Sequence, residues 1–479
     1  MRFKSYMLFL FILSMIVVPF IPFKGADELS YAFINVHLVP MSSEVVLDRQ
    51  TVMIMGSEIT TIGPSDQIRI PKNTTIINGE GYYLIPGLAD MHMHTREDWE
   101  EADIWPVHPL NLYLANGVTT IRDFAPTGST LTYALDWEKE IEAGLRDGPR
   151  IFTSGKLLYA SPLEDPAGIV RMNADLGFDF IKFYSYLSED DFLQGIQEAR
   201  ILGIYTAGHI PFAVGLEGVL ESGMDEIAHV EELIFEFFDF NRQQVLTPDE
   251  WWDVVKAGAV KSIEIEKEDY LDRFFRANAS GLESISSKLL AADIPVDSTM
   301  IVDRVVVQKN FQRESFLDKP ENMYFKNGYL ENYMAGDEKH LNQCRGVEVF
   351  CAAKEEIDGW IFRGLKEAGV LLVLGTDAGT GGMGIVPGYS VHEELAILVE
   401  NGMTPYQALQ CATTNAGIVA EKMTGEGDFG TIEVGNRADL ILVDSNPLED
   451  LSVLRTPAGV MAAGRWYERE ILQKMIEIE

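Results

Sequence analysis

Short apolar runs alternate with amphipathic segments from Leu88 to Ala420, and this alternation limits the possible folds more than any other feature of the chain. VTTIRDF is followed by LTYALDWEKEIEAGL, and FDFIKFY is followed by SEDDFLQGIQEARILG. Apolar runs of this length are typical of buried strands, and amphipathic runs are typical of surface helices. Strands that alternate with helices form a parallel sheet, and eight of them close a barrel. The sequence therefore predicts an α/β fold, a (β/α)8 TIM barrel.

The two ends of the chain have a different pattern. Short β-branched and aromatic runs broken by turn residues occur near the N-terminus, as in YAFINVHLV and YYLIP, and again near the C-terminus, as in ADLILVDSNP. Such runs are typical of strands, but neither end has enough of them for a good sheet domain alone. We therefore predict a small composite β domain, β-sandwich-like, built from residues 30–87 and 421–479, with the barrel at 88–420 between them.

Residues from about 231 to 358 exceed what two barrel units need, and we predict an insertion there. They are rich in aromatic and charged residues, as in LIFEFFDF, DEWWDVV and YLDRFF. An insertion after a strand would overhang the face of the barrel that holds the active site, as a lid or a substrate-selecting cap. The alternative is a set of amphipathic helices packed on the side of the barrel. We expect both arrangements, in different parts of the insertion.

The first 26 residues have the pattern of a secretory signal peptide. Arg2 and Lys4 precede an apolar run that starts at Met7. The run up to Phe23 is also almost long enough to span a bilayer, so an uncleaved anchor is the alternative. The sequence predicts an exported protein, periplasmic or extracellular, which is attached to a membrane only if this segment is retained.

Charge and cysteine content exclude several classes of protein. The 479 residues carry a net charge of −36, from 38 Lys and Arg against 74 Asp and Glu. Such a surface repels phosphate backbones, which argues against a nucleic-acid partner. Three cysteines, Cys344, Cys351 and Cys411, predict neither a disulfide-stapled fold nor a thiolate metal site. A homo-oligomer stays open.

The sharpest local feature is GLADMHMHT, in which His92 and His94 lie two residues apart at the end of an apolar run. On a strand both imidazoles project from the same face. With 8 histidines in the chain, an HxH pair would arise by chance about one time in eight, so the pair alone is a weak signal.

Four more candidate ligands stand near the ends of predicted strands: Lys182 in FDFIKFY, His209 in YTAGHI, His229 in EIAHVEE and Asp377 in VLGTDAG. A βα unit takes roughly 30 residues. Lys182 lies about three units after His94, His209 and His229 follow at about one unit each, and Asp377 follows after two units and the insertion. This spacing places the candidates on strands 1, 4, 5, 6 and 8. All would lie at the carboxyl ends of the strands, where such barrels have their active sites.

The sequence resembles the amidohydrolase superfamily, and in particular its imidazolonepropionase-like and prolidase-like members. The resemblance extends from about residue 30 to the C-terminus and includes IPGLADMHMHT, NGVTTIRDF, DFIKFY, LGTDAGT, ELAILVENGMTPYQALQCATTNAG and GTIEVGNRADLILVDSNPLED. It implies a metal-dependent (β/α)8 barrel with a composite β domain, the same architecture that the alternation of elements predicts.

The resemblance also implies a site with two divalent metal ions, for which zinc is expected. His92 and His94 would bind one ion, His209 and His229 the other, and a carboxylated Lys182 would bridge them. Asp377 would be both a ligand and the proton shuttle. A cationic ammonium beside two dications is strongly disfavoured, and a carbamate formed from the Lys182 amine and CO2 is an anionic oxygen ligand. The alternative is that Lys182 lies beside a mononuclear site.

These ligands imply hydrolysis of a C–N bond in a small amide, peptide (as in a dipeptidase) or cyclic amide, by a hydroxide that bridges the metals. A mononuclear deaminase of the same superfamily is the first alternative. Deaminases usually have a glutamate three residues after the strand-5 histidine, but Phe212 lies three residues after His209. A catalytically inactive, membrane-tethered binding protein is the second alternative, which the presence of all six ligand positions disfavours. Substrate-binding residues stay unknown from the sequence.

Other polar residues are predicted to be structural. Arg122 and Asp123 are expected to form a buried pair at the end of strand 2, with binding of a substrate carboxylate as the alternative for Arg122. His37 is expected to have a packing or surface role. His108 could support the metal ligands from behind, and His392 could line the mouth of the pocket.

Overall fold

The structure is a computed structural model, and it describes residues 30–101, 103–248, 250–259, 266–335, 342–380 and 383–478. The predicted signal peptide or anchor, residues 1–26, lies outside the described residues. Within the described ranges, no helix combines the length and the apolar character needed to cross a membrane.

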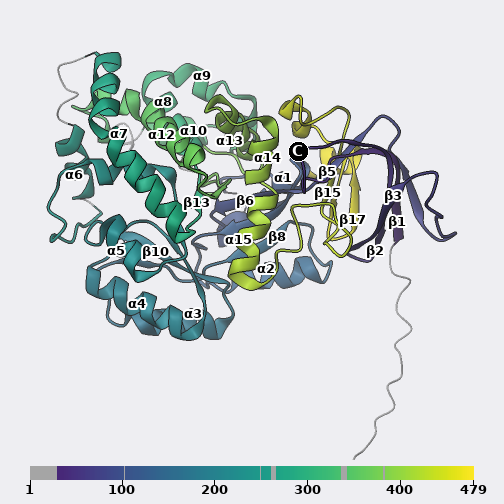
Figure 1. Cartoon of the computed structure of the whole chain (residues 1–479), viewed down its shortest axis with the longest axis horizontal. Coiled ribbons are helices and arrows are strands. Elements are labelled where there is room, and N and C mark those ends of the chain that lie inside the picture. Colours follow the sequence, from purple (N-terminus) through teal and green to yellow (C-terminus); the bar gives the residue numbers. More distant parts are fainter. Residues whose placement is uncertain are drawn as a thin grey trace, which may run out of the picture.

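Eight short parallel strands form the centre of the larger domain, as predicted (Figure 1). They belong to two sheets, β6-β7-β8 and β9 to β14 in sequence order, in which the short strand β9 (Leu158–Ala160) is an additional edge strand parallel to β10. Backbone hydrogen bonds join the two sheets: the Asp179 N–H donates to the Thr153 carbonyl (2.9 Å), and the Met91 N–H donates to the Leu374 carbonyl (2.8 Å). The strands are β6 (Leu88–Met93), β7 (Val118–Asp123), β8 (Arg150–Thr153), β10 (Phe180–Tyr186), β11 (Tyr205–Gly208), β12 (Glu226–Ile227), β13 (Val296–Asp297) and β14 (Leu372–Val373).

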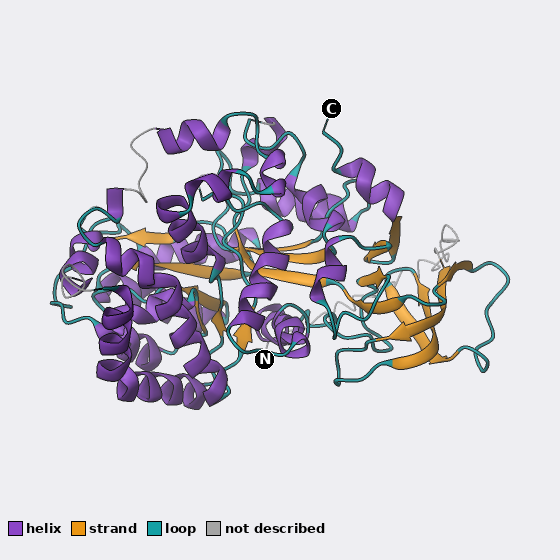
Figure 2. Ribbon diagram, turned by 90° about the horizontal axis from the view of Figure 1, so that it is seen from above, coloured by secondary structure: helices purple, strands orange, loops and turns teal. Residues whose placement is uncertain are grey.

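Helices surround these strands (Figure 2), and every residue of β6 and β7 is buried. Helix α4 shows how the sequence sets the boundaries of a helix. The Ser188 hydroxyl accepts a hydrogen bond from the Asp191 N–H at its start, and Gly203 ends it at a φ of 68°. The barrel helices are α1 (Pro109–Ala115), α2 (Tyr133–Glu142), α3 (Pro166–Leu176), α4 (Glu189–Leu202), α5 (Gly215–Ser222), α8 (Ile301–Phe311), α12 (Glu348–Ala368), α13 (Tyr389–Glu400), α14 (Pro405–Cys411) and α15 (Thr414–Thr424).

The two ends of the chain form one eight-stranded sheet beside the barrel, seen as the purple and yellow strands of Figure 1. Its order is β17-β16-β15-β5-β1-β2-β3, with β4 paired to β1. Strand β5 joins the ends, because it pairs in parallel with β1 and antiparallel with β15. The strands are β1 (Ser30–Leu38), β2 (Leu47–Met55), β3 (Glu58–Pro64), β4 (Thr75–Asn78), β5 (Tyr83–Pro86), β15 (Leu440–Val443), β16 (Gly459–Ala462) and β17 (Arg465–Glu468), followed by helix α16 (Arg469–Met475).

The region predicted as an insertion contains barrel strand β13, which divides it into two parts. Before β13 lie the 3-10 helix η2 (Val230–Phe237), α6 (Trp251–Ala259) and α7 (Lys267–Ala292), and after it lie α8, α9 (Arg313–Leu317), α10 (Tyr329–Ala335) and α12. Helix α7 packs along α12, which also contacts η2. A disulfide joins Cys344 to Cys351 at the start of α12. The sequence analysis did not foresee this bond, although the barrel itself is not stapled and Cys411 is a free, buried thiol.

Candidate metal centre

The six residues predicted as ligands lie on or shortly after barrel strands 1, 4, 5, 6 and 8, five of them at the carboxyl ends and Lys182 within its strand. His92 belongs to β6 and His94 follows its last residue, while Lys182 belongs to β10. His209 follows β11 directly, and His229 and Asp377 lie a few residues beyond β12 and β14. The spacing of the sequence therefore predicted the strand of each residue correctly.

One group of side chains comprises His92, His94 and Asp377. The His94 Nε2 lies 2.8 Å from the Asp377 Oδ1, and the His92 Nε2 lies 3.7 Å from the same oxygen. The ligand atoms of these three residues lie within 4.8 Å of one another. Ligand atoms this close together could all bind one metal ion.

His209 and His229 adjoin this group. The ring centroids of His209 and His229 are 4.7 Å apart, and those of His92 and His229 are 4.3 Å apart. The five side chains named so far thus form one continuous cluster.

Hydrogen bonds fix three of the imidazoles from behind. The Nδ1 atom of His92 lies 2.8 Å from Asp297 Oδ2, and that of His209 lies 2.6 Å from Glu232 Oε1. The Nδ1 atom of His229 lies 2.7 Å from Thr299 Oγ1. A carboxylate that accepts from Nδ1 fixes the ring orientation and leaves Nε2 as the atom that can bind a metal. The sequence analysis missed Asp297, Glu232 and Thr299. Asp297 ends strand 7 in IPVDSTMIV, and that position was the available signal.

Lys182 fits a site in which its amine is modified. The side chain is 1% exposed, and its Nζ has no hydrogen-bond partner among the described residues. Burial lowers the pKa of Lys182 from 10.5 to about 8, so a substantial fraction of the amine is neutral near physiological pH. The neutral amine is the form that reacts with CO2.

The His92 Nε2 is a second buried atom without a hydrogen-bond partner among the described residues. A buried polar group without a partner is costly, and in native proteins it signals an absent water, ion or ligand. Because the His92 and Lys182 atoms both belong to the same cluster, the donor set fits divalent metal ions.

The charge states of the cluster also suit metal binding. Burial lowers the pKa values of His92, His209 and His229 well below their ordinary value, so these imidazoles are neutral and their nitrogens can act as ligands. Burial alone would raise the pKa of Asp377, but the hydrogen bond with His94 and the nearby positive charges outweigh it and lower the pKa to about 2. Asp377 is therefore an anion at neutral pH.

Strained backbone positions the loops that follow strands 6, 7 and 8. His229, Thr299 and Asp377 have positive φ values of 65°, 40° and 57°. Residues other than glycine rarely adopt this conformation, and it tends to persist where a functional site requires it. Gly375 allows β14 to approach strand β6, since a Cβ there would lie 2.5 Å from the Cβ of His92.

Comparison with known proteins agrees with this geometry. The amidohydrolase family model matches residues 353–467. Ochratoxinase from Aspergillus niger is 24% identical over 440 residues, which cover 88% of this chain and 81% of the relative. The chain is therefore similar to amidohydrolases, over residues 353–467 by the family model and over most of its length by this relative. Imidazolonepropionase from Alkaliphilus metalliredigens (strain QYMF) is 21% identical and covers 82% of this chain and 83% of its own.

The fold of the chain also matches solved structures. The crystal structure of a Xaa-Pro dipeptidase with bound methionine in its active site superposes with a TM-score of 0.63 at 21% identity, over 92% of this chain and 100% of that one. The resemblance predicted from the motifs and the predicted barrel are therefore both confirmed.

Arg122 and Asp123 are both buried, but the prediction that they pair with each other is wrong. The Arg122 guanidinium donates two hydrogen bonds to Glu226, at the start of β12, with 2.7 Å from Nη1 to Oε2. Asp123 accepts instead from the Thr95 hydroxyl. The sequence could not identify Glu226 as the partner, because only closure of the barrel brings β7 and β12 to opposite sides of one interior.

Three other histidines of the described structure, His392, His108 and His37, lie outside the cluster. His392 is buried and donates from Nε2 to the Asn116 carbonyl (3.1 Å), so it does not line a pocket mouth. The His108 Nδ1 accepts from the Leu110 N–H (3.3 Å) and caps α1. The His37 Nδ1 lies 2.7 Å from Asp48 in the β sheet.

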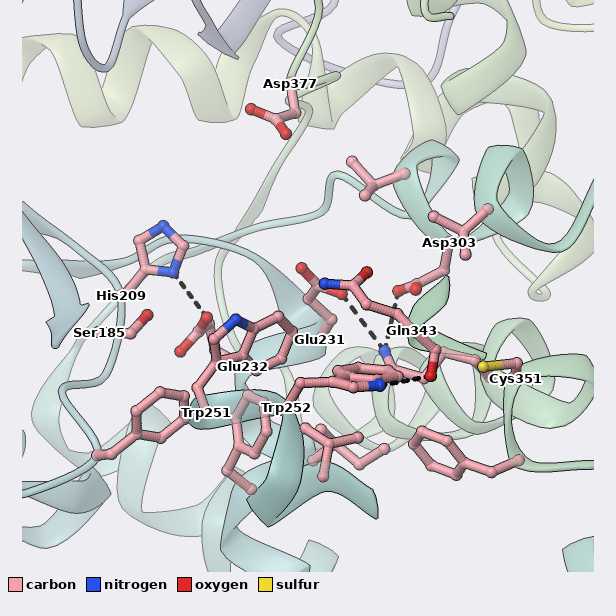
Figure 3. Close-up of a pocket in the computed structure, with 18 of the residues that line it drawn as sticks. Ser185, His209, Glu231, Glu232, Trp251, Trp252, Asp303, Gln343, Cys351 and Asp377 are labelled. Carbon is pink, nitrogen blue, oxygen red and sulfur yellow. Dashed lines mark hydrogen bonds and ion pairs between the residues drawn. The ribbon is translucent and has the colours of Figure 1, made fainter. Parts of the chain in front are cut away.

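A cavity of about 230 Å³ opens beside the cluster, toward the predicted insertion. His209, Glu232 and Asp377 line its inner end, and Figure 3 shows Trp251 and Trp252 together with Gln343 at the opposite end. The indole nitrogen of Trp252 donates to the Gln343 carbonyl. Part of the predicted insertion therefore does form a wall over the site, while α7 packs on α12 at the side of the barrel.

Proposed function

We propose that this chain is a metal-dependent hydrolase that cleaves a C–N bond in a small amide or peptide. The observation that carries the proposal is a buried cluster of potential ligands around His92, His94 and Asp377. Two of its side chains present buried atoms, His92 Nε2 and Lys182 Nζ, without hydrogen-bond partners in the described structure. The names of the relatives, ochratoxinase and Xaa-Pro dipeptidase, support this class of reaction.

We assign two divalent ions, zinc in the first instance, to this cluster. His92, His94 and Asp377 would hold one ion, and His209 and His229 the other. Lys182, carboxylated on Nζ, would supply an oxygen to each. Ions bound there would lower the pKa of a water molecule toward neutrality and polarise the carbonyl of the scissile amide.

The residues of the chain would then move the proton. Asp377 is ionised, and its carboxylate lies at the inner end of the cavity. It would accept the proton of the attacking water and deliver it to the leaving nitrogen, which is a poor leaving group unless it is protonated. His94 fixes the Asp377 carboxylate at 2.8 Å, and Asp297 and Glu232 fix the imidazoles of His92 and His209.

The buried Lys182 argues for this proposal over a mononuclear deaminase. The Lys182 Nζ has no hydrogen-bond partner in the described structure and lies 4.4 Å from the centroid of the Phe124 ring, which stacks on His92. A carbamate between two ions would give this buried amine a role as a ligand, whereas a single-ion site would not. Export of the protein, with or without an N-terminal anchor, stays a prediction from residues 1–26.

Metal analysis of the full chain tests the proposal. We expect two ions per chain after loading with Zn²⁺ and bicarbonate, and one or none in Lys182→Ala. Mass spectrometry of the native protein should show one added CO2 in the wild type alone. One ion per chain, or a Lys182→Ala variant with full metal content and full activity on an amide and dipeptide panel, would refute the two-ion site.

A further inference from the structure

The cavity beside the metal centre has a distinct apolar part and a distinct charge. Its aromatic side chains form a chain of contacts from the centre outward: the ring centroids are 4.9 Å apart for Phe212 and Phe235, 6.3 Å for Phe235 and Trp251, and 5.0 Å for Trp251 and Trp252. All four line the cavity. Aromatic walls of this kind bind flat or bulky apolar groups and exclude water from them.

The basic side chains in the described lining of the cavity already contact carboxyl groups. Apart from His209, which faces Glu232, the basic side chain in the described lining is Lys354. Its Nζ lies 2.9 Å from Asp303, 2.8 Å from Asp358 and 3.5 Å from Glu231. Three carboxyl groups therefore surround a single ammonium, and the cation is not free to bind a carboxylate of a substrate (Figure 3 shows two of these contacts).

The carboxyl groups already crowd one another. Glu231, Asp303 and Asp358 all lie within 3.5 Å of the same Lys354 Nζ. A further anion in the cavity would lie beside Glu231 and Asp303 without a partner, and an unpaired buried charge is strongly disfavoured. An amide or ammonium group can instead donate hydrogen bonds to these carboxylates.

The position of Asp377 indicates which half of the substrate enters the cavity. Asp377 lines the cavity and, under the proposed function on which this step rests, it protonates the leaving nitrogen. The amine half of the substrate therefore extends from Asp377 into the aromatic chamber.

We propose that this enzyme selects amides whose amine half carries an aromatic or bulky apolar side chain and no carboxylate. The chamber of Phe212, Phe235, Trp251 and Trp252 binds that side chain, and Glu231 and Asp303 reject an anion beside it. The preferred substrate class is thus an uncharged or cationic aromatic amide, such as a dipeptide amide, rather than a dipeptide with a free carboxylate.

Four matched compounds test this inference with the full, metal-loaded chain: alanyl-phenylalanine amide, alanyl-phenylalanine, alanyl-glycine amide and alanyl-glycine. Cleavage of the internal bond is followed by chromatography. We expect kcat/KM for alanyl-phenylalanine amide to exceed that of alanyl-phenylalanine, and also that of alanyl-glycine amide, by at least about tenfold. Equal or faster cleavage of the free acid, or of the glycine compound, would overturn the inference and leave the proposed function intact. Cleavage of none of the four would count against the proposed function as well.

Variants separate the chamber from general effects on folding. Trp252→Ala should reduce the ratio of kcat/KM between the phenylalanine and glycine amides by about tenfold. The control is Trp360→Ala, because Trp360 stacks on Phe275 in the same helical region but does not line the cavity. This control should leave the ratio unchanged. Glu231→Gln, an isosteric change, should reduce the preference for the amide over the acid. An equal change of ratio in Trp252→Ala and Trp360→Ala would refute the assignment of the chamber.

Binding measurements give a readout without turnover. Calorimetric titration of the wild-type chain should show tighter binding of phenylalaninamide than of phenylalanine, two products that differ at the carboxyl group. Tighter binding of phenylalanine would contradict the proposed charge selection.

Discussion

Replacement of Asp297 by Asn should weaken metal binding although Asp297 is not among the proposed ligands. The carboxylate is fully buried, and it accepts from the His92 Nδ1 at 2.8 Å through one oxygen and from the His229 N–H at 2.7 Å through the other. It therefore orients one residue from each half of the cluster. An Asn side chain has one acceptor oxygen and one donor NH2 group, so it can preserve only one of the two contacts.

The expected loss of metal affinity can be judged from carboxylates that orient metal-binding histidines in other proteins. Loss of a carboxylate that orients a metal-binding histidine costs about 10- to 100-fold in metal affinity, which corresponds to about 1.4 to 2.8 kcal/mol. The Kd for Zn²⁺ is measured by competition with a chromophoric chelator in the metal-depleted chain, for the wild type and Asp297→Asn. Melting temperatures of the metal-free proteins separate weaker binding from a general loss of stability.

Asp191→Asn is the matched control for this experiment. Asp191 is also a mostly buried aspartate in the barrel, and it accepts hydrogen bonds from the Ser161 hydroxyl and the Leu163 N–H, neither of which belongs to a proposed ligand. Its replacement should lower stability but leave the Zn²⁺ affinity within about twofold. Unchanged affinity in Asp297→Asn, or an equal loss in Asp191→Asn, would refute the argument.

Three further predictions follow from the same site. Asp377→Asn should keep much of the bound metal but lower turnover by about 10²- to 10⁴-fold, because the proton carrier is lost; unchanged turnover, measured beside metal content, would exclude this role. Because the pKa of Lys182 is lowered to about 8, the neutral amine that reacts with CO2 increases as the pH rises from 6 to 9. At a fixed concentration of dissolved CO2, reconstitution of the metal-free chain with Zn²⁺ should therefore be faster at pH 9 than at pH 6, and a rate that is independent of pH would contradict the carbamate. Arg122→Met leaves the Glu226 carboxylate buried without its ion-pair partner and should lower the free energy of unfolding by about 3 to 5 kcal/mol in denaturant titrations. The double variant Arg122→Met/Glu226→Leu should recover part of this loss. A single variant as stable as the wild type would show that the pair does not stabilise the fold.

The sequence alone determined the class of fold and the strand on which each ligand lies. Buried parallel strands have to be apolar on both faces and their helices on one, so the alternation from Leu88 to Ala420 is visible without coordinates. Ligands near the carboxyl ends of the strands are separated in sequence by multiples of the length of one βα unit, roughly 30 residues. His92, Lys182, His209 and His229 could therefore be assigned by counting residues.

Only the tertiary structure decided which side chains meet across the barrel. Asp297 contacts His92 over 205 residues of chain, and Glu226 contacts Arg122 over 104. Neither pair has a period or a motif, because closure of the barrel brings strands together irrespective of their separation in sequence. For the same reason the cavity wall could be predicted as a cap, but not as the specific set of Trp251, Trp252 and Lys354. Hydrophobic periodicity reports local burial, whereas hydrogen bonds and ion pairs depend on where distant segments meet.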